Sequence, residues 1–127
     1  MFLDELRTDP AYNEEDIDCY IHVSATIQAI GGRWKMLILW HLEEGARRYN
    51  ELRRLIPGVS QKMLTQQLKE LEQDGLIERK VYPETPPRVE YVMTDYGKTL
   101  EPIFNCMYDW GVIHRKRSGQ QSAAETD

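Results

Sequence analysis

Apolar residues recur at helical spacing in the middle of the chain. Leu64, Leu68 and Leu71 fall on one face of a helix that would begin after Ser60 and end at Gly75. A serine hydroxyl at Ser60 can accept a hydrogen bond from a free N–H of the first turn, and Gly75 can adopt the left-handed conformation that ends many helices. The pattern therefore predicts an amphipathic helix between these two residues.

A two-stranded hairpin is predicted directly after this helix. Val89, Tyr91 and Met93 occupy every second position of its second strand, which is the period of a half-buried strand. The run YPETPP ahead of that strand contains three prolines, which fix the tip and remove edge hydrogen-bond donors. A helix followed at once by such a hairpin is typical of the recognition helix and wing of a winged helix-turn-helix.

Two helices are predicted ahead of this unit. Residues 20–30 place Val23, Ile27 and Ile30 on one inward face. Residues 34–42 are apolar almost all round, as expected for a helix in the middle of the core. Only the second of these helices is therefore expected in the middle of the core.

A short helix and a turn complete the helix-turn-helix. Asn50 is a suitable N-cap for this helix, and Pro57 and Gly58 form the turn that leads to Ser60. After Thr94, a last helix carries one apolar face, made by Leu100, Ile103, Phe104, Met107 and Trp110. The expected fold class is mainly α (α+β), a winged helix-turn-helix with N- and C-terminal dimerisation helices.

The expected dimer follows from the size of the apolar faces. The helix-turn-helix core is too small to cover the faces of both the first and the last helix, and an uncovered patch of that size normally marks an interface. Two-fold pairing is the commonest closed assembly. We therefore expect a homodimer.

Charge divides the chain into three parts. Residues 1–18 hold seven acids against one arginine and show no apolar periodicity, and residues 118–127 hold two acids and no base. We expect an acidic flexible arm at 1–18, the winged helix-turn-helix domain with its dimerisation helices at 19–117, and a disordered tail at 118–127. The domain keeps fifteen bases against twelve acids, a balance that is compatible with DNA binding although the pI of 5.2 is low for it.

Several function classes find no support in the sequence. No stretch approaches the roughly 18 apolar residues of a membrane span, and the acidic N-terminus is no signal peptide, so we expect a cytoplasmic protein with reduced thiols. His22, His41 and His114 share no metal-ligand spacing, and there is no CxxC pair. No phosphate loop, nucleophile elbow or paired-carboxylate motif is present. We expect no enzyme, no cofactor and no metal.

The polar face of the central helix has the chemistry of a base-reading surface. It presents Lys62, Thr65, Gln66, Lys69 and Gln73, which are long or hydrogen-bonding side chains of which only two are charged. Gln can pair with adenine through two hydrogen bonds, and Lys can donate to the acceptors of guanine. The alternative is an ordinary solvated helix packed on a hairpin.

Three motifs resemble the HxlR-type winged-helix transcriptional regulators of bacteria. They are IGGRWKMLILWHL (30–42), RYNELRRLIPGVSQKMLTQQLKELEQDGLIER (48–79) and VYPETPPRVEYVMTDYGKTL (81–100). The resemblance implies a homodimer that presents two winged helices to a pseudo-palindromic operator. It also implies that Ser60, Gln61, Lys62 and Thr65 lie where the recognition helix enters the major groove, and that Arg88 lies at the base of the wing.

These observations assign two kinds of contact with double-stranded DNA. Bases are read from the start of the recognition helix, by Gln61, Lys62, Thr65 and Gln66. Phosphates are held mainly by Arg48, Lys80 and Arg88. The predicted function is a sequence-specific DNA-binding regulator, a repressor; the alternative is a winged helix that serves as a protein-interaction module.

The sequence leaves two kinds of effector open, an oxidant that acts on a thiol and a small molecule. Many members of the family carry a redox-sensing cysteine at the position of Ile21, whereas Cys19 lies two residues upstream here. Two residues turn a helix by about 200°, so Cys19 would face elsewhere if the helix already runs there, and could sense oxidants if the segment is irregular. A small-molecule effector is the alternative. Cys106 is expected to be a buried packing residue.

Overall fold

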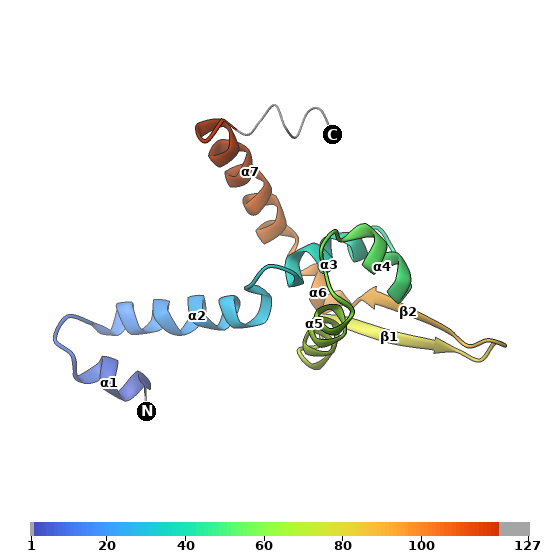
Figure 1. The fold of residues 1–127 in the computed structure, drawn as a ribbon. Coiled ribbons are helices and arrows are strands. Elements are labelled where there is room, and N and C mark those ends of the chain that lie inside the picture. Colours follow the sequence, from blue (N-terminus) through green and yellow to red (C-terminus); the bar gives the residue numbers. More distant parts are fainter. Residues whose placement is uncertain (1, 120–127) are drawn as a thin grey trace.

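Seven helices and one hairpin make up residues 2–119, the part of the chain that the computed structural model describes (Figure 1). In chain order they are α1 Phe2–Thr8, α2 Glu14–Ile30, α3 Lys35–Glu43, α4 Tyr49–Leu55, α5 Gln61–Gln73, β1 Ile77–Tyr82, β2 Arg88–Met93, α6 Asp95–Lys98 and α7 Glu101–Arg117. The helices α3 to α5 with the hairpin form the expected winged helix-turn-helix. Residues 120–127, and with them most of the expected disordered tail, lie outside the described part.

The core of the domain forms between α3, α4, α5 and the base of the hairpin. The leucine stripe of α5 is buried as predicted, against Ile38, Leu39, Leu42, Leu52, Ile56 and Ile77. The α3 helix differs from expectation, because Leu37 and Trp40 are exposed while Lys35 is buried. An apolar sequence on every face therefore does not mean burial on every face.

The first 18 residues differ from the expected flexible arm. Residues 2–8 are helical, and α2 already begins at Glu14 rather than near residue 20. The reason is a capping box: the Asp16 N–H donates to the Asn13 side chain at 2.8 Å, and the Asn13 N–H donates to the Asp16 carboxylate at 3.1 Å. Burial of Leu6 and Ile17 accompanies the packing of α1 on α2.

The short α4 helix also begins earlier than predicted. Its N-cap is Arg48 and not Asn50, and the Arg48 N–H donates to the Glu51 carboxylate at 3.0 Å. Glutamate at the third helical position accepts a hydrogen bond from the N–H of the N-cap residue, so this helix begins without the predicted asparagine cap. Tyr49 thereby becomes the first residue of the helix.

The hairpin is tied to the segment ahead of α4. Its strands pair antiparallel from Ile77–Met93 at the base to Tyr82–Arg88 near the tip. At the base, Arg47 and Tyr91 exchange two backbone hydrogen bonds, with N···O distances of 3.0 and 2.8 Å. These two bonds hold the wing beside the helix-turn-helix.

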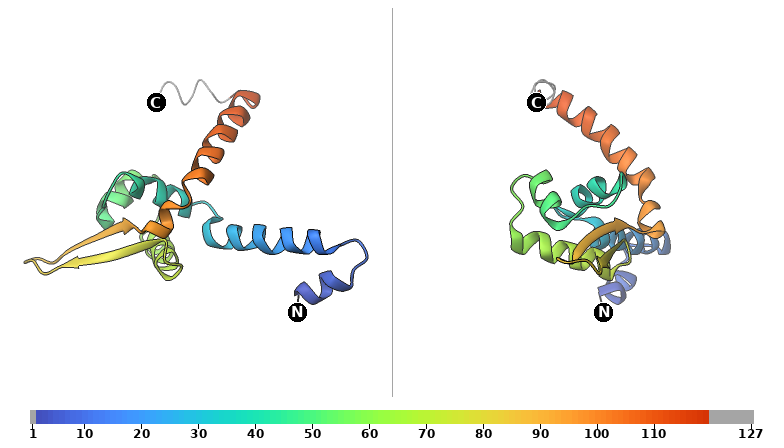
Figure 2. Two further views of the ribbon diagram at one scale, coloured as in Figure 1. Left: turned by 180° about the vertical axis from the view of Figure 1, so that it is seen from behind. Right: turned by 90° about the vertical axis from the view of Figure 1, so that its right-hand side faces the viewer.

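The helices α2 and α7 leave the core in different directions (Figure 2). Val23 and Ile27 of α2 are 51% and 63% exposed, so within one chain only Ile30 of the predicted inward face is buried. On α7, Met107 and Trp110 are exposed as well. Cys106 is also exposed, and its predicted burial is wrong for the single chain. Both helices therefore present apolar surface that the described residues 2–119 leave exposed.

Candidate nucleic-acid interface

The outer face of α5 forms a shallow groove lined by polar side chains. Its lining residues are Gln61, Lys62, Thr65, Gln66 and Lys69. All five are exposed, and the groove contains two lysines and no acid. Four of them, Gln61, Lys62, Thr65 and Gln66, are the residues that the sequence predicted to read bases. The surface that these four form with Lys69 is named the reading face. The buried leucine stripe on the opposite face of α5 fixes the direction in which these side chains point.

Ser60 shapes the start of this helix. Its Oγ accepts a hydrogen bond from the Met63 N–H at 3.0 Å, as an N-cap should. The remaining free N–H groups of the first turn and the helix dipole make this end of α5 attractive to an anion. Ser60 therefore positions the reading face, and its hydroxyl proton can still be donated to a phosphate.

Tyr49 connects α4 to the reading face and was not singled out from the sequence. Its hydroxyl donates to the Gln61 carbonyl oxygen at 2.9 Å and lies 3.0 Å from the Thr65 hydroxyl. Both partners line the groove. They lie twelve and sixteen residues further along the chain, so no local pattern indicates this contact.

Two of the predicted phosphate-binding cations are exposed. Arg48 precedes Tyr49 at the start of α4, and Lys80 lies on β1. The last turn of α4 adds two exposed arginines that the prediction omitted, Arg53 and Arg54. The run of basic residues in α4 was the signal that could have identified them.

Arg88, the third predicted phosphate ligand, is engaged within the wing. Its guanidinium lies 3.4 Å from the Glu84 carboxylate and 3.6 Å from that of Glu90, and its Cζ lies 4.1 Å from the centre of the Tyr82 ring. The side chain is 31% exposed. Two acids therefore compensate the charge that was expected to hold a phosphate. The predicted position at the base of the wing is also wrong, because Arg88 pairs with Tyr82 near the tip of the hairpin.

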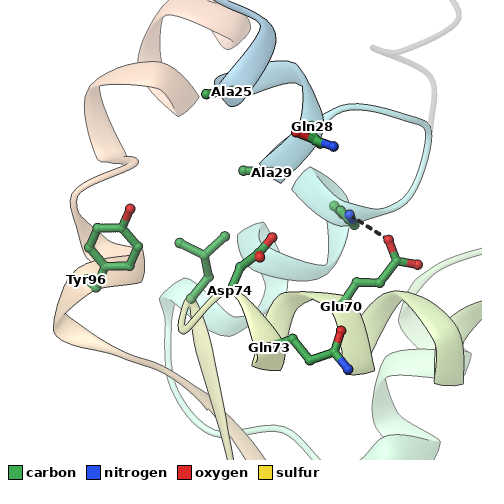
Figure 3. Close-up of a pocket in the computed structure, with 9 residues that line it drawn as sticks. Ala25, Gln28, Ala29, Glu70, Gln73, Asp74 and Tyr96 are labelled. Atoms are coloured by element: carbon green, nitrogen blue, oxygen red, sulfur yellow. Dashed lines mark hydrogen bonds and ion pairs between the residues drawn. The ribbon is translucent and has the colours of Figure 1, made fainter. Parts of the chain in front are cut away.

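A second hollow lies behind α5, between that helix and α2 (Figure 3). It has a volume of about 430 Å³ and is lined by Ala25, Gln28 and Ala29 of α2 and by Glu70 and Gln73 of α5, among others. The buried ammonium of Lys35 donates to the Glu70 carboxylate at 3.0 Å. This hydrogen bond, followed by the charge of Lys35, lowers the pKa of the Glu70 carboxyl below its ordinary value.

Cys19 lies on the uncovered side of α2. It lines an open groove together with Tyr20, Val23 and Ile27. Because α2 already runs through this segment, the two-residue offset from Ile21 places Cys19 on a different face from that position. Cys19 instead shares the side of Val23 and Ile27, four and eight residues further along the helix.

Other ligand classes find little support in the described residues. Within residues 2–119, no three His, Cys, Asp or Glu side chains gather in a way that could hold a metal ion. No helix in that part of the chain is both long and apolar enough to cross a membrane.

Comparisons with known proteins agree with this architecture. The family model described as HxlR-like helix-turn-helix matches residues 29–119. The uncharacterised HTH-type transcriptional regulator YdeP of Bacillus subtilis is 49% identical over 102 residues, which make up 80% of each chain.

Solved structures give the same result. The HTH-type transcriptional regulator YtcD, from the same organism, has a TM-score of 0.72 at 52% identity, over 74% of this chain and 96% of that one. The redox regulator HypR in its reduced form has a TM-score of 0.72 at 46% identity, over 77% and 97%.

Proposed function

Since the chain belongs to the HxlR-like helix-turn-helix family of DNA-binding transcriptional regulators, we propose that it represses transcription as a homodimer on a pseudo-palindromic operator. The observation that carries the proposal is the acid-free reading face of α5, with its two exposed lysines. A groove without acids can approach the major groove of DNA without repelling the phosphates on either side.

The side chains divide by the part of DNA that they contact. Gln61, Lys62, Thr65 and Gln66 read base edges, since they line the exposed groove at the start of α5. Ser60 contacts a phosphate at the helix N-terminus, where its hydroxyl proton remains available.

Exposed cations on the flanking elements hold further phosphates. Arg48 does so from α4 and Lys80 from the wing, because both are exposed. Arg88 contributes less than these two, because a phosphate must compete with Glu84 and Glu90 for its guanidinium.

The dimer would form through α2 and α7. Val23 and Ile27 on one helix and Met107 and Trp110 on the other leave apolar area uncovered in the single chain. A two-fold axis would present two α5 helices to successive major grooves, about 34–36 Å apart. Sedimentation of the wild type should show a dimer at micromolar concentration, and Trp110→Asp should shift it towards monomer. A wild type that sediments only as monomer would overturn this part of the proposal.

A second candidate function concerns how this regulator is itself controlled: an oxidant would act on Cys19. Exposure of Cys19 on the apolar side of α2 favours it, because a two-fold axis near this helix would bring two thiols together. HypR, whose structures include a reduced and an oxidised form, is a redox regulator by description.

Oxidation by diamide separates this candidate from a ligand-controlled regulator. A non-reducing gel should show a linked dimer for the wild type and none for Cys19→Ser, and operator affinity should change only in the wild type. Equal affinities before and after oxidation in both proteins would exclude a thiol switch.

Selection of bound duplexes from a random pool tests the central function. We expect an enriched sequence with two-fold symmetry, bound with an affinity that falls steeply with salt, since each phosphate contact contributes a slope of about −0.9. A winged helix that serves only as a protein-interaction module would enrich no sequence.

A further inference from the structure

Three oxygen atoms form a hydrogen-bonded chain at the edge of the reading face. The Tyr49 hydroxyl oxygen lies 2.9 Å from the Gln61 carbonyl oxygen and 3.0 Å from the Thr65 hydroxyl oxygen. A carbonyl oxygen has no proton, so the short contact with Gln61 requires the proton of Tyr49. The single hydroxyl proton of Tyr49 is therefore already used.

The direction of the second hydrogen bond follows from the first. Because Tyr49 has no proton left, the 3.0 Å contact must use the proton of Thr65, with the tyrosine oxygen as acceptor. Thr65 is exposed and lines the groove of α5. Its hydroxyl proton is turned towards Tyr49, and only its two lone pairs remain for a partner outside the protein.

We propose that Tyr49 makes Thr65 a hydrogen-bond acceptor towards DNA and so selects a base that carries an amino group. This inference rests on the proposed function, in which α5 reads the major groove. A free threonine hydroxyl can donate or accept and therefore contacts any base. In the major groove, adenine N6 and cytosine N4 are donors, whereas guanine O6 and thymine O4 are acceptors. A Thr65 that can only accept favours adenine or cytosine at the base that it contacts.

Tyr49 is thus a positioning residue that sets the specificity of another side chain. It lies on α4, one residue after the exposed Arg48, and its hydroxyl contacts two residues of the reading face. The preference at one operator position would then depend on a residue outside the recognition helix. Loss of one such hydrogen bond should change base preference by about three- to tenfold.

The experiment compares selected sequences for four proteins. Wild type, Tyr49→Phe, Thr65→Val and the control Tyr96→Phe are each used to select duplexes from one random pool. Tyr96 is an exposed tyrosine of α6 that lines the hollow behind α5, away from the reading face. We expect one position per half-site at which the wild type and the control prefer adenine or cytosine.

The variants should alter only that position. Tyr49→Phe returns the proton of Thr65 to the groove, so guanine and thymine should be tolerated there. Thr65→Val keeps the shape of the side chain but replaces the hydroxyl by a methyl group and so removes the acceptor, so the amino preference should disappear. A fifth protein that combines Tyr49→Phe with Thr65→Val should match Thr65→Val alone, since Tyr49 acts through Thr65. A purely structural role of Tyr49 would lower affinity at all positions alike and leave the preferences unchanged.

The possible failures are distinct. A wild type that enriches no sequence overturns the proposed function and this inference with it. An enriched wild-type sequence with an unchanged Tyr49→Phe profile overturns the inference alone, as does a thymine or guanine preference at the position that Thr65→Val alters. If Tyr49→Phe does not fold, Thr65→Ser takes its place: the amino preference should persist in Thr65→Ser and vanish in Thr65→Val, and the opposite result contradicts the inference.

Discussion

The recognition helix and the wing both carry positive side chains, but they differ in which charge takes part in an ion pair. On α5 it is an acid that is neutralised: Glu70 is held by the buried ammonium of Lys35 at 3.0 Å, away from the two lysines of the reading face. On the wing it is a cation that is neutralised: Arg88 lies between Glu84 and Glu90. Lys62 and Lys69 therefore line a groove that contains no acid, whereas the charge of Arg88 on the wing is compensated by two acids. We propose that this pairing, rather than the number of basic residues, decides where DNA affinity arises.

The largest expected effect concerns the support behind the two surfaces. Leu68 is buried under the reading face, whereas Val81 on β1 is 54% exposed. Leu68→Ala should lower the free energy of unfolding by about 2–5 kcal/mol, because it removes buried apolar area and leaves a cavity. Val81→Ala, the matched control on the wing, should change it by less than about 0.5 kcal/mol. Urea unfolding measures both, and equal losses would contradict the idea that the core supports α5 more than the exposed part of the wing.

A free cation on α5 should matter more than a lysine elsewhere. Lys62→Ala should weaken operator binding by roughly 1–3 kcal/mol, because it removes a base contact from the groove. Lys98→Ala is the control, since Lys98 is an exposed lysine of α6 that lies 3.9 Å from Asp95. Fluorescence anisotropy with the selected operator measures both affinities. A loss of similar size in Lys98→Ala would mean that only net charge matters.

Removal of the two acids beside Arg88 should raise the DNA affinity of the wing. The double change Glu84→Gln and Glu90→Gln removes both acids beside Arg88 and frees its guanidinium for a phosphate. Affinity for all duplexes should rise, and the slope of log affinity against log salt should steepen by about 0.9, the contribution of one phosphate contact. If the slope does not change after release, Arg88 is out of reach of the DNA.

The added effect must depend on Arg88 itself. The same two glutamate substitutions combined with Arg88→Ala should leave the slope at its wild-type value. A slope that steepens in this triple variant would indicate that removal of wing acids acts through net charge alone.

The smallest expected effect is a pH dependence from the Lys35–Glu70 pair. The pKa of Glu70 is lowered in the folded state, so its contribution to stability is fully present above the unfolded value of about 4.3. That contribution is lost as the pH falls through the lower folded pKa. The stability difference between wild type and Glu70→Gln should therefore be constant near neutral pH and shrink below about pH 4.

A matched substitution on the same helix checks the origin of this effect. Glu72 is exposed and lies two residues further along α5. Urea unfolding between about pH 3 and pH 7 should give Glu72→Gln a curve parallel to that of the wild type. A wild-type to Glu70→Gln difference that persists unchanged at the acid end would contradict the role of the ion pair.

Local patterns predicted the parts of the molecule that local forces determine. The leucine stripe, the Ser60 cap and the Gly75 stop placed α5 correctly, and alternation with prolines placed the hairpin. The start of α2 was missed, although the capping box at Asn13 is readable in principle, because the helical periodicity before residue 20 is weak.

The remaining features depend on distant partners. Periodicity shows that Val23 and Ile27 share a face, but it does not show whether that face packs against the same chain or a second copy. Hydrogen bonds between Tyr49 and residues twelve and sixteen positions away exist only once the chain is folded, as do the ion pairs of Arg88 with two glutamates. The residues on the exposed face of α5 were therefore predictable from the sequence, whereas their hydrogen bonds were not.

The ratio of operator affinity to affinity for an unrelated duplex, at one salt concentration, tests the central claim most directly. The account predicts that Lys62→Ala lowers this ratio by roughly fivefold or more, because a base contact is lost. It predicts that Arg88→Ala leaves the ratio at the wild-type value, because any contact that Arg88 makes is with phosphate. A ratio that falls in Arg88→Ala and is unchanged in Lys62→Ala would contradict the assignment of α5 as the surface that reads the operator.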